Sequence, residues 1–471
     1  MEFRPVFSYL GTLLEIMGIL LIMPLFVSIL AGEGISFLFI AAAIASFAAG
    51  TALDRRFRKG KLDGSSVMVL ALAGLVSFSI IGMVPYLSVT GPVNALFESV
   101  SGFTTTGLTV LDPEALPAGL LFWRGFTQWI GAAGIIMFFF LLVDSQGISS
   151  NYLYGDEVGE EEKAPLIRKA LAAFGLYTVL GIVLLSLAGM PPLDAVAHSF
   201  SGISTGGFST REGSIGAFNS QAVNLVMIIL MVLGGTSFFL HTKIFSGNPK
   251  SYLKDYEARV FWGMVVVFSI LLVSASFTGW GGNMLSAVFT TVSALTTSGF
   301  YTASPAPGFA SLLIIILVII GGFSASASGG LKIVRVGAMG KAFPWIARKL
   351  SYPREAVIPL KLGGKAVKPQ EFTIITLFIF VYIMMLVAST AVLSFLGISI
   401  ADSFFVSASA ASNAAFSPIG LGAMHWAGKA VLMAVMVVGR LEVLPLFVFI
   451  RHLLQARKRE EGGDEYHPRK G

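Results

Sequence analysis

The 471-residue sequence contains no cysteine, and only 12% of its residues are charged. The missing cysteines exclude disulfides, thiolate metal sites and cysteine nucleophiles, although they leave the cellular compartment open. Soluble domains carry about a quarter charged residues, whereas this chain is 55% hydrophobic and has a mean hydropathy of +0.81. The shortage of charge therefore predicts a polytopic membrane protein.

Ten apolar runs are long enough to cross a hydrocarbon core of about 30 Å. The first run has about 24 residues, more than the roughly 7–15 apolar residues of a cleaved signal peptide, so we expect it to remain as a span. The ten predicted spans are residues 7–30, 35–53, 65–89, 117–143, 169–190, 221–240, 260–279, 308–331, 371–397 and 426–450.

The positive charges fall on one side of this predicted topology. If the N-terminus is cytoplasmic, the 32 lysines and arginines lie in or beside cytoplasmic segments, with four exceptions. This bias follows the positive-inside rule, so both termini are expected in the cytoplasm, and the net charge of +6 does not indicate nucleic-acid binding. The cytoplasmic segments are 1–6, 54–64, 144–168, 241–259, 332–370 and 451–471, and the exceptions are Arg124, Arg211, Lys429 and Arg440.

A polar motif rich in threonine, serine and glycine recurs inside the apolar sequence. It reads SGFTTTG, SGISTGG and SALTTSG, and it ends on Gly107, Gly207 and Gly299, which are 100 and 92 residues apart. A weaker copy within residues 411–422, ASNAAFSPIGLG, puts Ser417 at the glycine position, 118 residues after Gly299. Because a period near 100 residues is the size of a domain, the sequence predicts four copies of one unit.

Each copy consists of a spanning helix, a short segment, the polar motif and a second spanning helix. The short segments are PVNALFESVSG, PLDAVAHSFSG, GNMLSAVFTTVSA and IADSFFVSASAAS. A helix of about ten residues covers about 15 Å, half of the bilayer, so these segments are predicted to be re-entrant pore helices. The predicted units are an N-terminal helix pair at 1–60, pore repeats at 61–150, 151–247, 248–350 and 351–455, and a cytoplasmic tail at 456–471.

The predicted fold is therefore an all-α polytopic membrane protein with four parallel repeats in a pseudo-fourfold arrangement around a central pore. Non-helical backbone at membrane depth must be buried or line water. Backbone carbonyls from four strands can replace the water around a cation, and glycine permits the left-handed backbone that turns carbonyls toward one axis. The alternatives are a simple turn between helices or a ring of acidic side chains, but no acidic residue aligns across the copies.

Five motifs in this sequence together resemble those of the Trk/Ktr/HKT superfamily of potassium transporters, and the extra N-terminal helix pair is similar to its TrkH branch. The resemblance covers roughly residues 5–455. It implies a homodimeric, channel-like potassium uptake protein with one pore per subunit, no bound cofactor and a separate cytoplasmic TrkA-type ring that binds nucleotides. The motifs are FESVSGFTTTGLTV, FWRGFTQWIGAAGI, HSFSGISTGGFST, GGFSASASGGLKIVR and GRLEVLPL.

The resemblance also implies which residues coordinate potassium. In the fourth strand a serine stands where the superfamily usually has glycine, and in plant relatives a serine in the first strand accompanies sodium permeation. A sodium-permeable or sodium-coupled transporter is therefore the alternative. The implied potassium-binding residues are Thr105, Thr106 and Gly107; Thr205, Gly206 and Gly207; Thr297, Ser298 and Gly299; and Ala415, Phe416 and Ser417.

A glycine- and serine-rich stretch, residues 321–332, interrupts the second helix of the third copy and is predicted to unwind, because glycine destabilises a helix interior by about 1 kcal/mol. The resemblance implies that it forms a gate below the filter, with Arg440 as a barrier. The alternatives are a packed glycine-rich helix face for the stretch and a structural ion pair for the arginine. The predicted gate residues are Gly321, Gly322, Ser324, Ser326, Ser328, Gly329, Gly330 and Arg440.

Glu98 and Arg124 are predicted to pair behind the filter as support residues. His198 occupies the position of Glu98 in the second copy and is expected to be a packed, hydrogen-bonded residue rather than a metal ligand. A membrane-embedded enzyme would need a base beside the hydroxyl groups of the motifs, and none aligns with them, so we predict no enzyme. Charge runs such as the acidic stretch after Tyr154 and the basic segment 332–368 are usually solvated surfaces; if one of them docks the cytoplasmic ring, the basic segment is the better candidate, because it is joined directly to the glycine- and serine-rich stretch.

Overall fold

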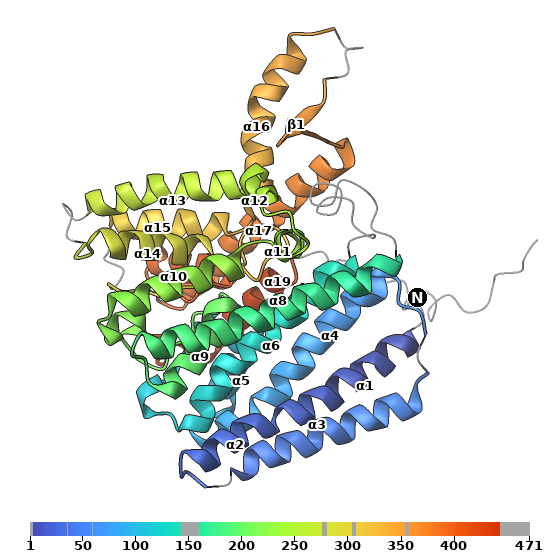
Figure 1. Ribbon diagram of the computed structural model, residues 1–471, viewed down its shortest axis with the longest axis vertical. Coiled ribbons are helices and arrows are strands. Elements are labelled where there is room, and N and C mark those ends of the chain that lie inside the picture. The colour runs from blue at the N-terminus through green and yellow to red at the C-terminus, as the bar shows by residue number, and fades with distance from the viewer. Residues whose placement is uncertain are drawn as a thin grey trace, which may run out of the picture.

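The computed structural model describes residues 3–34, 36–58, 60–142, 160–275, 280–303, 308–353 and 358–442, which are mostly helical. Figure 1 shows long helices packed side by side, with one short hairpin projecting at the end of the molecule near α16. This architecture confirms the predicted all-α membrane fold. The end of the last predicted span at 443–450 and the tail at 456–471 lie outside the described residues.

The N-terminal helices α1 (Phe3–Leu20), α2 (Ile22–Leu30) and α3 (Phe37–Arg56) lie outside the repeats, next to α4 and α6 (Figure 1). Two glycines bring α1 and α3 together, because a Cβ on Gly11 would lie only 2.7 Å from the Gly50 carbonyl oxygen. Close packing through small residues is a common way for helices to associate in membranes.

The four repeats share one pattern, as predicted: a long helix, a short pore helix, a non-helical strand and a second helix. Each pore helix has 12 residues and therefore a length of about 18 Å, too short to span the bilayer. The repeats contain α4 (Gly64–Gly82), α5 (Pro92–Phe103) and α6 (Ala118–Leu142); α8 (Glu160–Leu187), α9 (Pro192–Ile203) and α10 (Gln221–Gly235); α13 (Tyr256–Ser274), α14 (Met284–Leu295) and α15 (Phe309–Ile320); and α17 (Pro369–Phe395), α18 (Ile400–Ala411) and α19 (Trp426–Arg440).

The starts of the pore helices are encoded locally. Proline stands in the first turn of α5 and of α9, where its missing amide hydrogen costs nothing. In α14 and α18, the side chains of Asn283 and Ser399 accept hydrogen bonds from backbone amides of the first turn.

The repeats form a closed ring. The second helix of each repeat contacts the pore helix of the next: α6 contacts α9, α10 contacts α14, α15 contacts α18, and α19 returns to α5. All four pore helices therefore surround one axis, as expected for parallel repeats.

Two predicted spans are shorter than expected. Among the described residues, seven helices are long and apolar enough to cross a membrane, or eight if α10 and α11 (Phe238–Phe245), which meet at 97°, are counted as one. The predicted span 221–240 therefore breaks after Gly235, and the predicted span 308–331 ends as a helix at Ile320. At the first break, the amides of Phe323 and Ala327 donate to the carbonyls of Gly235 and Gly234, so a neighbouring loop satisfies the freed backbone groups.

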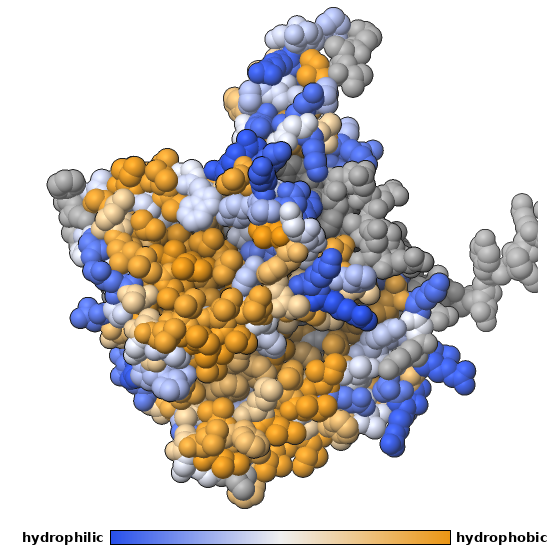
Figure 2. Space-filling view, viewed as in Figure 1, coloured by the Kyte–Doolittle hydropathy of each residue, from blue (hydrophilic) through white to orange (hydrophobic). Residues whose placement is uncertain are grey.

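Among the remaining elements, α16 and the β1–β2 hairpin project at one end of the molecule (Figure 1). Figure 2 shows a mostly apolar surface over the helical body and a polar surface around α16, as expected for lipid-facing and water-facing regions. The elements are α12 (Lys250–Lys254), α16 (Ile333–Leu350), and the antiparallel strands β1 (Leu360–Leu362) and β2 (Lys365–Val367), together with the short helices η1 (Val84–Ser88), η2 (Pro113–Ala115) and η3 (Ser214–Phe218).

Candidate ion pathway

Each pore helix is followed by a strand with the same backbone hydrogen bond. The amide of Thr106 donates to the carbonyl of Ser101 at 2.8 Å, and the other three repeats repeat this bond at the same distance. The equivalent pairs are Gly206 with Ser201, Ser298 with Ser293, and Ala414 with Ser409. The four strands, 104–107, 204–207, 296–299 and 412–415, are therefore structurally equivalent.

Left-handed residues alternate along these strands. Thr105, Thr205, Thr297 and Asn413 have φ values of 52–55°, and the three glycines Gly107, Gly207 and Gly299 follow with 79–81°. In an ordinary extended strand, successive carbonyls point to opposite sides. Left-handed residues at every second position reverse that alternation, so that consecutive carbonyls can line one side of the strand.

The glycines allow neighbouring strands to touch. A Cβ on Gly107 would overlap the carbonyl oxygen of Gly206 in the next strand, and a Cβ on Gly207 would overlap that of Ser298. A Cβ on Gly299 would in turn overlap the backbone of Ala415. The strands are thus arranged around the axis in chain order, at distances that exclude side chains at these positions.

The fourth strand corrects the predicted alignment. Asn413 matches the left-handed threonines and Ala415 matches the glycines, two residues before the predicted Ser417. Ser417 closes a turn beyond the strand, where its hydroxyl donates to the Ile419 carbonyl at 2.6 Å, and Phe416 is buried in the hydrophobic core. The bond from the Ala414 amide to the Ser409 carbonyl decides this register, because it aligns Ser409 with the serines that open the first three copies of the motif.

Side chains tie the strands to each other and to their surroundings. The Asn413 amide group donates to Thr106 Oγ1 and to the Met436 carbonyl of α19, both at 2.9 Å. From α6, Gln128 Nε2 donates to the Gly206 carbonyl at 2.7 Å. Neither residue was predicted from the sequence, although Asn413 is the one amide side chain in a run of small residues, 407–415.

Below the strands, the predicted break after α15 is a loop, residues 321–332. Its amide at Gly329 donates to Thr297 Oγ1 at 2.7 Å, and a Cβ on Gly329 would overlap the Ser412 carbonyl oxygen. The loop therefore packs directly against the third and fourth strands. From α13, the buried carboxylate of Glu257 accepts from the amide and the hydroxyl of Ser324 at 3.0 and 3.1 Å.

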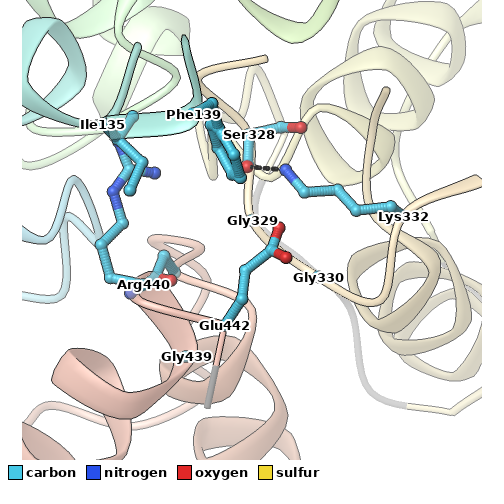
Figure 3. Close-up of a pocket in the computed structure, with 10 residues that line it drawn as sticks. Ile135, Phe139, Ser328, Gly329, Gly330, Lys332, Gly439, Arg440 and Glu442 are labelled. Carbon is cyan, nitrogen blue, oxygen red and sulfur yellow. Dashed lines mark hydrogen bonds between the residues drawn. The ribbon is translucent and has the colours of Figure 1, made fainter. Parts of the chain in front are cut away.

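Arg440, at the end of α19, holds the same loop from another side. It is buried, and its Nη1 donates to the Ala327 carbonyl at 2.7 Å, while its Nε and Nη2 have no hydrogen-bond partner among the described residues. Glu442 does not neutralise it, because that carboxylate pairs with Arg335 of α16. Figure 3 shows Arg440 and Lys332 on opposite sides of Glu442, with Lys332 Nζ bonded to the Ser328 carbonyl. The positive charge of Arg440, which no carboxylate of the described residues pairs with, therefore lies beside the loop.

The predicted support pair is present. Arg124 Nε lies 3.5 Å from Glu98 Oε2, and both side chains are buried. Glu98 Oε1 accepts hydrogen bonds from the Val110 and Leu111 amides, while Arg124 Nη1 donates to the Ser209 carbonyl at 3.0 Å. The pair therefore connects the segments that leave the first and second strands.

His198 lies at the equivalent position of the second repeat. Its Nδ1 is 2.8 Å from the Asp194 carbonyl and therefore donates, which leaves Nε2, 3.0 Å from Ser209 Oγ, to accept. Both ring nitrogens are thus engaged in protein contacts, as expected of a packed histidine. No group of three metal-ligating side chains occurs in the part of the chain that the structure describes.

Comparison with known proteins agrees with this architecture. The family model TrkH, described as "Cation transport protein", matches residues 36–461. The chain is 33% identical to the Trk system potassium uptake protein TrkH of Vibrio parahaemolyticus, over 96% of this chain and 99% of the relative. The chain belongs to the TrkH family.

Two further relatives and one solved structure show the same similarity over nearly the whole chain. A TrkH of Salmonella typhimurium is 31% identical over 95% of this chain and 98% of its own, and an uncharacterized cation transporter of Methanocaldococcus jannaschii is 32% identical over 96% of both chains. The crystal structure of the Vibrio parahaemolyticus potassium transporter TrkH superposes with a TM-score of 0.86 at 28% identity, over 96% of this chain and 99% of that one. TrkH proteins are transport proteins, so the chain is not an enzyme, as predicted.

Proposed function

We propose that this TrkH-family chain is the channel-like, ion-permeating subunit of a potassium uptake system. The observation that supports this best is the ring of four equivalent strands, each placed at the C-terminal end of a half-length helix. Helix C-termini carry a partial negative charge, which favours a cation at the point where they converge. Relatives of this chain are described as potassium uptake proteins.

In this proposal the strands act as the selectivity filter. A potassium ion loses water on entering, and carbonyl oxygens from the strands replace it. The left-handed residues at Thr105, Thr205, Thr297 and Asn413 support this role, because they allow carbonyls to face the axis. The sodium alternative rested on Ser417 at the glycine position, but Ala415, another residue with a side chain, occupies that position instead.

The loop at 321–332 and Arg440 act as the gate. The loop lies against the third and fourth strands, and its last residue, Lys332, leads directly into α16, so a displacement of α16 would pull the loop. The buried guanidinium of Arg440 repels a cation that leaves the filter. Release of its bond to Ala327 together with a shift of the loop would open the pathway.

The surrounding assembly completes the proposal. The chain lies in the cell membrane with both termini in the cytoplasm, and it forms a homodimer in which each subunit has its own pore. A separate TrkA-type nucleotide-binding ring docks on the basic segment 332–368, which the loop connects to the gate. The lysines of α16 and of the β1–β2 hairpin supply the positive surface of this segment.

A flux measurement tests the filter. The purified chain is reconstituted into liposomes, and uptake of tracer rubidium, a potassium substitute, is compared with that of sodium for the native chain, Gly107→Ala and Gly175→Ala. The first variant inserts a Cβ against the next strand and is expected to abolish rubidium flux. The second has open space around its Cβ and should conduct like the native chain. Equal rubidium flux in all three would refute the proposed filter.

A further inference from the structure

The side chain of Ala415 lies where three glycines converge. A Cβ placed on Gly107, Gly207 or Gly299 would lie within 2.7 Å of the Ala415 Cβ. These glycines belong to the first, second and third strands, and each would point its missing side chain at the same methyl group. The methyl group therefore lies at the centre of the ring, in the space that the other three strands leave empty.

The backbone of the fourth strand differs at the same position. The three glycines are left-handed, whereas Ala415 keeps a negative φ. A residue with a Cβ avoids the left-handed region because its side chain would clash with its own backbone, at a cost that glycine does not have. Ala415 therefore departs from the carbonyl arrangement of the other strands as well as filling the axis.

The neighbouring residues hold Ala415 in place. Ala414 and Phe416 on either side are fully buried in the hydrophobic core. Asn413 is bonded to Thr106 and to α19, and the Ser412 hydroxyl lies 2.6 Å from the Tyr382 hydroxyl of α17. A strand with these anchors cannot rotate its methyl group away from the axis without breaking several contacts.

We propose that Ala415 is a specificity-determining residue that limits potassium flux and weakens discrimination against sodium; this inference rests on the proposed filter. Selectivity for potassium has been explained either by cavity size or by the number of coordinating carbonyls. A methyl group on the axis narrows the cavity, and a strand with a different backbone removes a carbonyl from the ring. Both effects favour the smaller sodium ion over potassium, so the two explanations predict the same direction.

Replacing Ala415 tests the inference in the full chain. Ala415→Gly removes the methyl group and is expected to raise rubidium flux into liposomes about tenfold, equivalent to about 1.4 kcal/mol of barrier, and to raise the ratio of rubidium to sodium flux. Ala415→Val enlarges the obstruction and should lower rubidium flux. Ala423→Gly makes the same chemical change at an exposed position beyond the strand, and it should match the native chain.

The outcomes separate this inference from the proposed filter. If Gly107→Ala abolishes flux but Ala415→Gly leaves both flux and ion ratio unchanged, the filter stands and the role of Ala415 is overturned. If Ala423→Gly produces the same gain as Ala415→Gly, loop flexibility explains the effect, and the inference also fails. If Gly107→Ala conducts normally, or if no chain conducts, including Ala415→Gly, the proposed filter fails and the inference falls with it.

Discussion

Gly329→Ala is the sharpest test of the proposed gate. Gly329 lies in the loop below the strands, and a Cβ at this position would overlap the Ser412 carbonyl oxygen of the fourth strand. The residue has no left-handed backbone, so alanine adds only a steric clash. The clash exists only while the loop is packed against the filter, and the substitution therefore penalises the closed arrangement alone.

The size of the effect follows from this geometry. Inserting a methyl group into a packed site typically costs about 1–3 kcal/mol. If the open state escapes this cost, the ratio of open to closed molecules rises by roughly 5- to 150-fold. The bonds from the Gly329 amide to Thr297 and from Arg440 to Ala327 oppose the displacement of the loop. They do so equally in the native chain and in Gly329→Ala, so they do not change the expected ratio of the two fluxes.

The assay is rubidium flux into liposomes at low protein density, where flux is proportional to the open fraction. Gly263→Ala is the matched control, because a Cβ at this position of α13 meets nothing within 4 Å. We expect Gly329→Ala to exceed both the native chain and the control. Unchanged or reduced flux in a folded variant with an intact thermal transition would refute the idea that the packed loop closes the pathway.

Two further predictions concern buried charges. Arg440→Gln keeps a hydrogen-bond donor for Ala327 but removes the charge, so cation flux should rise; a decrease would assign Arg440 a purely structural role. Glu98→Gln leaves Arg124 buried without its partner, a change that typically costs about 3–5 kcal/mol. The variant should show a lower thermal unfolding temperature in detergent than the native chain, and an unchanged temperature would show that the pair contributes little.

The pore helices and the break at 321–332 could be predicted because their signals are local. Proline, asparagine and serine mark the helix starts, and the run of glycines and serines marks the place where α15 ends. The pair of Glu98 with Arg124 could also be anticipated, because a buried charge needs a partner.

The break between α10 and α11 was missed, although Gly234 and Gly235 precede it. Glycines inside an apolar helix are common in membranes, so they do not identify a break on their own. The bend depends on the loop at 321–332, which lies about 90 residues away in sequence and supplies the hydrogen-bond donors and acceptors that the broken helix needs.

The fourth strand illustrates the same limit. The predicted alignment followed a polar residue, Ser417, whereas the true register follows Ser409, which matches the serine that opens each of the other three motifs. Asn413 and Thr106, which hold the fourth strand against the first, are 307 residues apart in sequence. No local property of either residue specifies that contact.

Composition and local backbone preference were therefore enough to determine a membrane protein of four repeats with half-length helices and glycine-rich strands, because hydrophobicity and the demand for left-handed backbone belong to individual residues. The tertiary structure decided which residues meet on the axis. Ring closure brings Ala415 to the point where three glycines converge. It also places Glu442 in an ion pair with Arg335 rather than with Arg440. Such pairings depend on the packing of distant segments, and they become defined only when the ring is complete.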